Sequence, residues 1–132
     1  MLQTVIAVLL QAAVAFTTVA RGADSQITAP REVIVRTADE WRALWKDHSA
    51  ASLPVVDFSR LMVVGVFLGT RPTAGYAADI VRVQSQGTGA IVEYREVQPA
   101  RGGLTAQVLT APFQLVSIPR VMGTIEFRKL AP

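Results

Sequence analysis

Few side chains in this sequence have the chemistry for catalysis or metal binding. The chain has no cysteine and one histidine, His48, so thiolate nucleophiles, disulfide bonds and thiolate metal sites are excluded, and one imidazole gives no metal-ligand spacing. A catalytic triad would need a serine close to His48, but no serine here has the glycine-flanked elbow that exposes a nucleophile. The serines in question are Ser49, Ser52, Ser59 and Ser117. We therefore predict no enzyme, no catalytic residue, no metal and no cofactor.

Two further pairs of residues have functional and structural interpretations. Glu93 and Glu96 have the residue types of a glycosidase carboxylate pair, but in a strand residues three apart point to opposite faces. Trp41 and Trp45 have the spacing of one helix face, which is more typical of a core than of a ligand-stacking site. We interpret the glutamates as solvated surface and the tryptophans as core.

The charge pattern argues against nucleic-acid binding. Thirteen Lys and Arg face ten Asp and Glu over the whole chain. Arg21 is the only one of the thirteen before Asp24, so twelve face ten from there on, a net charge of +2. The two signs are interspersed, whereas a nucleic-acid footprint needs clustered basic residues. We expect no nucleic-acid partner.

The N-terminal segment has the composition of a signal peptide. No charged residue occurs in residues 1–20, where residues 5–10 begin a nearly unbroken apolar run. Small residues follow, as in residues 18–20 (Thr-Val-Ala), which signal peptidase requires. The basic start of a signal peptide is missing. The alternative is an uncleaved membrane anchor, because the run is only slightly shorter than the roughly 20 residues that a spanning helix needs.

We predict cleavage near Ala20 or Ala23. The chain then consists of a signal peptide at residues 1–23 and a single domain at residues 24–132, and the expected location is the periplasm or the extracellular space. The protein would contact a membrane only if the segment stays uncleaved.

Apolar runs separated by turn residues predict a mainly β protein. Residues 61–68 are apolar throughout, which indicates a strand covered on both faces. Residues 37–40 (Thr-Ala-Asp-Glu) have the form of a capping box and predict a helix that ends near His48. The predicted strands span residues 32–36, 61–68, 76–84, 90–97, 104–110, 113–118 and 124–130. We expect a seven-stranded antiparallel immunoglobulin-like sandwich with one helix inserted between the first two strands. The alternative is an α+β sheet with the helix packed on one face.

Three predicted loops have the composition of a shaped recognition surface. If consecutive strands run up and down, residues 69–75, 99–103 and 119–123 leave the domain at the same end, and each loop has a proline, an arginine and a glycine. Proline and glycine specify backbone shape, and arginine offers a planar fork of donors. Plain turns have a similar composition. The predicted partner-binding residues are Arg71, Pro72, Thr73, Gly75, Tyr76, Arg101, Gly102, Gly103 and Arg120.

Several segments resemble the C-terminal domain of the protease-complex subunit PrcB family. The segments are residues 41–45, 56–59, 66–76, 109–113 and 116–119, and the most specific is Gly-Thr-Arg-Pro-Thr-Ala-Gly-Tyr at residues 69–76. The resemblance implies an exported, non-enzymatic accessory domain that associates with an extracellular protease and stabilises it. Attachment through a lipidated cysteine is not expected, because the chain has none.

A more distant similarity suggests an alternative function. Residues 72–76 (Pro-Thr-Ala-Gly-Tyr) resemble a loop of chagasin-type inhibitors of papain-like cysteine proteases, and residues 101–103 partly match a second loop of that family. The resemblance implies three loops at one end of an immunoglobulin-like fold that enter the protease cleft. The Arg-Pro-aromatic motif of the third loop is absent from residues 119–121. A purely structural envelope domain is a third possibility.

Overall fold

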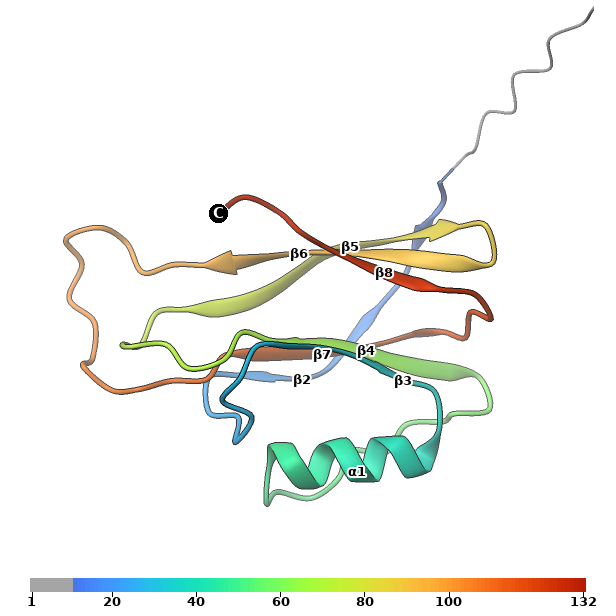
Figure 1. Cartoon of the computed structure of the whole chain (residues 1–132), viewed down its shortest axis with the longest axis horizontal. Coiled ribbons are helices and arrows are strands. Elements are labelled where there is room, and N and C mark those ends of the chain that lie inside the picture. The colour runs from blue at the N-terminus through green and yellow to red at the C-terminus, as the bar shows by residue number, and fades with distance from the viewer. Residues whose placement is uncertain (1–10) are drawn as a thin grey trace, which may run out of the picture.

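Residues 11–132, which the computed structural model describes, form two four-stranded sheets and one helix (Figure 1). The first sheet has the strand order β1-β5-β6-β8, and the second has the order β2-β7-β4-β3. The elements are β1 (Ala13–Val14), β2 (Thr17–Gly22), β3 (Arg31–Val35), α1 (Ala38–His48), β4 (Leu61–Phe67), β5 (Ala77–Gln86), β6 (Gly89–Val97), β7 (Phe113–Pro119) and β8 (Ile125–Lys129). The predicted mainly β fold with one helix is confirmed.

Two apolar layers hold these elements together. The layer between the sheets includes Val64 and Val66 of β4, and the layer between the second sheet and α1 includes Val63 and Phe67 of the same strand. Successive side chains of a strand point to opposite faces, so β4 contributes to both layers. This explains its continuous apolar sequence and confirms that the strand is covered on both faces.

Helix α1 begins at the predicted capping box. Thr37 Oγ1 accepts a hydrogen bond from Glu40 N at 3.2 Å and donates one to Glu40 Oε1 at 3.0 Å. Trp41 and Trp45 are buried, and their indole N–H groups donate to backbone carbonyls of the 49–60 connector at 2.9 and 2.8 Å. The helix thus covers the outer face of the second sheet and fastens the connector that returns to β4 (Figure 1).

The strand count and directions differ from the prediction. Residues 104–110 form no strand: their backbone hydrogen bonds go to residues 71–74, which belong to no sheet, and only Thr110 makes a bridge, with Arg71. The chain therefore passes from β6 to β7 without the additional strand that was predicted between them. As a consequence, β8 starts at the end of the molecule opposite to the one expected. As a result β8 pairs parallel to β6. Residues 11–132 contain eight strands, in one antiparallel and one mixed sheet, instead of the seven antiparallel strands predicted.

Two of the strands lie inside the predicted signal segment. β2 pairs with β7 along the edge of the second sheet, with Thr17 opposite Ser117, and β1 pairs with β5. The folded strands therefore begin before residue 24, and cleavage near Ala20 or Ala23 would remove most or all of β2. The apolar run at residues 5–10 lies outside the described residues, and cleavage stays a prediction.

Candidate binding surface

Two long connections leave the sheets at one end of the molecule. Phe67 at the end of β4 lies opposite Phe113 at the start of β7, and Ala77 at the start of β5 lies opposite Val97 at the end of β6. The β4–β5 and β6–β7 connections therefore emerge side by side (Figure 1). We call residues 68–76 and 98–112 together the loop end. It contains every predicted partner-binding residue except Arg120.

Backbone hydrogen bonds join the two connections into one unit. Arg71 N donates to Thr110 O at 2.7 Å, and Thr110 N donates back to Arg71 O at 2.9 Å. Ala74 N donates to Ala106 O at 3.0 Å, and the Thr110 hydroxyl donates to Thr73 O at 2.9 Å. Backbone pairing of this kind restricts both loops, so the surface loses little conformational entropy when a partner binds.

Gly75 occupies a position in the loop end that no other residue would fill without strain. Its φ is +96°, and a Cβ there would lie 3.0 Å from Cβ of Pro99. A positive φ is costly for any residue with a Cβ. The predicted role of glycine in specifying loop shape is therefore seen here as a close approach between the two connections.

Arg71 makes an intramolecular ion pair below the loop backbone. Its Nε donates to Glu96 Oε1 at 3.0 Å, its Nη2 contacts the same oxygen, and Lys129 Nζ lies 3.9 Å from it. Burial raises the pKa of Glu96, but the hydrogen bond and charge of Arg71, aided by Lys129, hold that pKa below its ordinary value. Arg71 therefore positions the loop, and its guanidinium is not the free contact group that the sequence suggested.

The glutamates interpreted as solvated surface are mostly buried. The Glu96 side chain is 11% exposed and that of Glu93 is 12% exposed. Glu93 accepts hydrogen bonds from Arg82 at 3.0 and 3.1 Å. The interpretation of these glutamates as solvated surface was therefore wrong. Each carboxylate has its own arginine partner, Arg82 for Glu93 and Arg71 for Glu96, so the two do not form a carboxylate pair.

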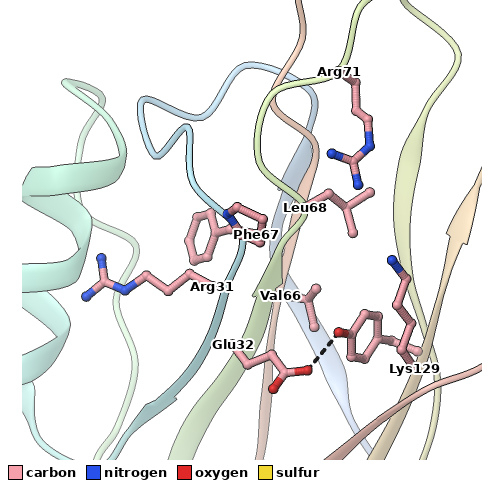
Figure 2. A pocket seen from close by; sticks show the side chains of 9 residues that line it. Arg31, Glu32, Val66, Phe67, Leu68, Arg71 and Lys129 are labelled. Carbon is pink, nitrogen blue, oxygen red and sulfur yellow. Dashed lines mark hydrogen bonds between the residues drawn. The ribbon is translucent and has the colours of Figure 1, made fainter.

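A cavity of about 300 Å³ opens beside Arg71, between the edge of the second sheet and β6 and β8 (Figure 2). Tyr94 donates its hydroxyl to Glu32 Oε2 at 2.7 Å across this cavity. Burial and the neighbouring carboxylate raise the pKa of Tyr94, so the hydroxyl stays protonated as a donor. Arg31 extends toward the helix, where its Nη1 lies 3.8 Å from Asp47 Oδ2. The polar side chains that line the cavity are therefore paired within the chain, and the rest of the lining is apolar.

Arg120 lies at the opposite end of the molecule from the loop end. Its Nη1 donates to the backbone carbonyls of Arg36 and Phe58 at 2.9 and 2.6 Å, and its own N–H donates to Arg60 O at 3.2 Å. The prediction that the three loops share an end was wrong for residues 119–123, because the missing strand at 104–110 reverses the parity of every later connection. The three-loop geometry of the inhibitor alternative is lost with it.

A segment that the sequence gave no reason to select completes the loop end. Residues 23–30 connect β2 to β3, and within them Asp24 makes a bridge with Ala111 while Thr28 O accepts from Thr70 N at 3.0 Å. Together with both connections this segment lines a shallow cavity of about 330 Å³. No sequence motif marks this segment.

The loop end also exposes a group of large apolar side chains. Leu104 is fully exposed, Leu109 is 76% exposed and Val108 is 53% exposed. Arg101, Gly102 and Gly103 are exposed beside them. Of the predicted residues on the β4–β5 side, Pro72 and Gly75 are exposed, and Thr73 and Tyr76 are half-buried. Exposed apolar side chains on one projecting loop are typical of a contact surface.

His48 forms a buried pair with a serine that the sequence did not single out. Ser25 Oγ lies 2.7 Å from His48 Nδ1 and accepts a hydrogen bond from Ile27 N at 3.0 Å. Both side chains are buried, and the imidazole packs edge-on against Trp45 and Phe113. Burial lowers the pKa of His48, against the opposing charge of Asp24. The pair fastens the 23–30 segment to the end of α1.

The described part of the chain offers neither a metal centre nor a membrane span. Among residues 11–132, no group of three or more His, Cys, Asp or Glu side chains is placed to hold a metal ion. No helix within the same residues has the length and apolar character to cross a bilayer.

Comparison with known families identifies the region that carries the loop end. The PrcB C-terminal family model matches residues 62–119. These residues run from β4 to the last residue of β7 and include both connections of the loop end. The match confirms the predicted resemblance of this region to the PrcB C-terminal family. No curated protein and no solved structure matches the chain. The family suggests a protease-associated domain.

Proposed function

We propose that this chain is a non-enzymatic, exported accessory domain that associates with a protease through its loop end and stabilises it. The main support for this proposal is that the loop end lies inside the region that matches the family model. Two hydrogen-bonded connections there present Leu104, Val108 and Leu109 to solvent. A pre-shaped surface with apolar anchors is the usual basis of a specific protein interface.

The structure changes which residues should contact the partner. Arg71 and Arg120 are engaged within the chain, so their role is to hold backbone in place. Arg101 and the apolar side chains of the β6–β7 connection are free of such pairing among the described residues. We propose Leu104, Leu109 and Arg101 as the contact residues, with Pro72 and Gly75 beside them.

The experiment is co-purification of an exported protease from the native host with the tagged full-length chain. The captured protein is identified by mass spectrometry, and its proteolytic activity and thermal half-life are measured with and without the chain. We expect capture by the wild type and loss of capture by Leu104→Asp/Leu109→Asp. A matched control is Met122→Asp, because Met122 is 85% exposed but lies in the β7–β8 connection.

Two results would contradict the proposal. Equal capture by wild type and the loop variant would remove the loop end as the contact surface. Reduced protease activity in the presence of the chain, with an unchanged half-life, would indicate inhibition instead of stabilisation.

A further inference from the structure

The N-terminal strands lie across the side of the two-sheet body that is opposite to β3. β1 pairs with β5 at the edge of the first sheet, and β2 pairs with β7 at the edge of the second (Figure 1). One short segment, residues 13–22, thus connects both edges. We call the surface of β5 and β7 that it covers the acceptor groove.

The covering segment is much less buried than the strand beneath it. No residue of β2 is fully buried, whereas six of the seven residues of β7 are. A register shift between Thr18 and Ala20 also interrupts the β2–β7 ladder. The segment therefore contributes a small share of the core, while β7 needs a neighbour to complete its backbone hydrogen bonds.

Three side chains at alternate positions of the segment, the half-buried Val14 and Phe16 and the exposed Thr18, define what the groove accepts. Val14 and Phe16 pack against the layer between the sheets. Two residues further on, Thr18 Oγ1 accepts a hydrogen bond from Gln114 Nε2 at 3.1 Å. The groove thus receives an apolar residue, a second apolar residue and a hydroxyl at alternate positions of an extended chain.

Gln114 makes the hydroxyl position specific. Its side chain is buried at 2% exposure, and its Oε1 is already occupied by Ile80 N at 2.6 Å. The amide therefore cannot turn away from Thr18 without leaving the Ile80 N–H unpaired. If the segment is absent, the Nε2 donor loses its protein acceptor and is left to solvent, because Thr18 already lies at an exposed position of β2.

We propose that the acceptor groove is a strand-binding site for an extended segment of another protein. Ala20, one of the two predicted cleavage positions, lies within β2, so processing there would remove residues 13–20 from the groove and leave Arg21 and Gly22 paired with β7. The incoming segment pairs with the β7 edge and carries the pattern apolar-x-apolar-x-hydroxyl, as in strand addition to an open sheet edge. This site is independent of the loop end, and in the unprocessed chain residues 13–22 occupy it themselves.

The experiment begins with the folded full-length chain and a labelled peptide. A site-specific protease sequence is inserted between Ala23 and Asp24, and the purified protein is cut. A fluorescent peptide of residues 11–22 is added, and exchange is followed by anisotropy. We expect the cut protein to take up the peptide and the uncut protein not to do so. Peptides with Phe16→Asp or Thr18→Val should bind at least about tenfold and severalfold more weakly, respectively.

A peptide substitution and a covalent lock serve as controls. Thr17→Val in the peptide should leave binding unchanged, because the Thr17 contact from Ser117 is made to its backbone carbonyl, whereas Thr18 accepts through its side chain. The cysteine-free chain also allows one unambiguous disulfide between Thr17→Cys and Ser117→Cys, which lie opposite each other. With this disulfide formed, the cut protein should not bind the peptide, and reduction of the disulfide should restore exchange.

A second variant keeps the proposal testable if the cut protein loses its fold. Full-length Phe16→Asp weakens the chain's own segment without cleavage and should bind the wild-type peptide in trans. The proposal is overturned if neither protein binds the peptide while tryptophan fluorescence reports a folded core. It is also overturned if Phe16→Asp and Thr18→Val peptides bind as well as wild type. Light scattering that shows a dimer with exchanged N-terminal segments would assign the groove to a second copy instead.

Discussion

The guanidinium of Arg71 donates a hydrogen bond to the carboxylate of Glu96, with Nε 3.0 Å from Oε1. This bond connects the β4–β5 connection to the end of β6. Both side chains are largely buried, at 21% and 11% exposure. A charge-assisted hydrogen bond in such a site is stronger than an exposed one. The shape of the loop end therefore depends on a side chain that is paired within the chain.

The first prediction concerns this ion pair. Arg71→Ala should lower the free energy of unfolding by about 2 kcal/mol, because it leaves the Glu96 carboxylate without its main partner. Urea denaturation measures the change. The matched control is Arg42→Ala, whose partner Asp39 is 88% exposed and whose loss should cost no more than about 0.5 kcal/mol. Equal effects of the two substitutions would show that Arg71 has no special structural role.

The second prediction concerns pH. The pKa of His48 in the folded state is held below its ordinary value of 6.5 by burial, with Asp24 as the nearby opposing charge. The unfolded chain therefore binds a proton more readily, so stability is retained above pH 6.5 and falls as the pH decreases below it. Chemical denaturation between pH 8 and pH 5 should show this decline.

The control for the pH prediction removes the titrating group. His48→Gln should flatten the decline between pH 6.5 and pH 5 while preserving a hydrogen-bonding side chain beside Ser25. An identical pH profile in wild type and variant would mean that other groups, such as the carboxylates, govern stability in this range.

The sequence predicted most of the elements because their local patterns are strong. The capping box at Thr37 and Glu40 predicted the start of α1 correctly, and the apolar run of β4 predicted a strand with two covered faces. Residues 104–110 also alternate, but alternation produces a strand only where a sheet edge is available to pair with. Whether a sheet edge is available depends on the tertiary structure, so the alternating pattern alone wrongly predicted a strand at residues 104–110.

The errors in the candidate site follow from that one strand. The prediction of a strand at residues 104–110 placed Arg120 at the same end as Arg71. Because this strand is absent, Arg120 lies at the opposite end. The β1 and β2 strands were missed for a different reason: a short apolar segment with small residues fits both a signal peptide and a sheet edge. The role of the 23–30 segment depends on bridges such as Asp24 to Ala111, which no spacing in the sequence reveals.

The third prediction concerns Gln114, which links the two sheets. Its Oε1 accepts from Ile80 N at 2.6 Å, beside the register shift of the β5–β6 ladder between Ile80 and Arg82. Gln114→Leu should therefore cost about 1–3 kcal/mol, since a buried N–H loses its acceptor. Thr18→Val removes only the second bond and should cost less. Thermal or urea unfolding of both variants checks the order, and a larger loss for Thr18→Val would contradict it.

The last prediction concerns Gly75 and separates loop shape from loop composition. Gly75→Ala should destabilise the protein by about 1–3 kcal/mol, because the new Cβ combines a positive φ of 96° with a 3.0 Å approach to Pro99. Gly87→Ala is the matched control, since Gly87 also has a positive φ, 57°, but a Cβ there would meet nothing within 4 Å. It should cost about 1 kcal/mol. The Gly75 variant should also weaken protease capture, whereas the Gly87 variant, in the β5–β6 turn away from the loop end, should not. Equal capture by both variants would mean that the partner does not require the native shape of the loop end.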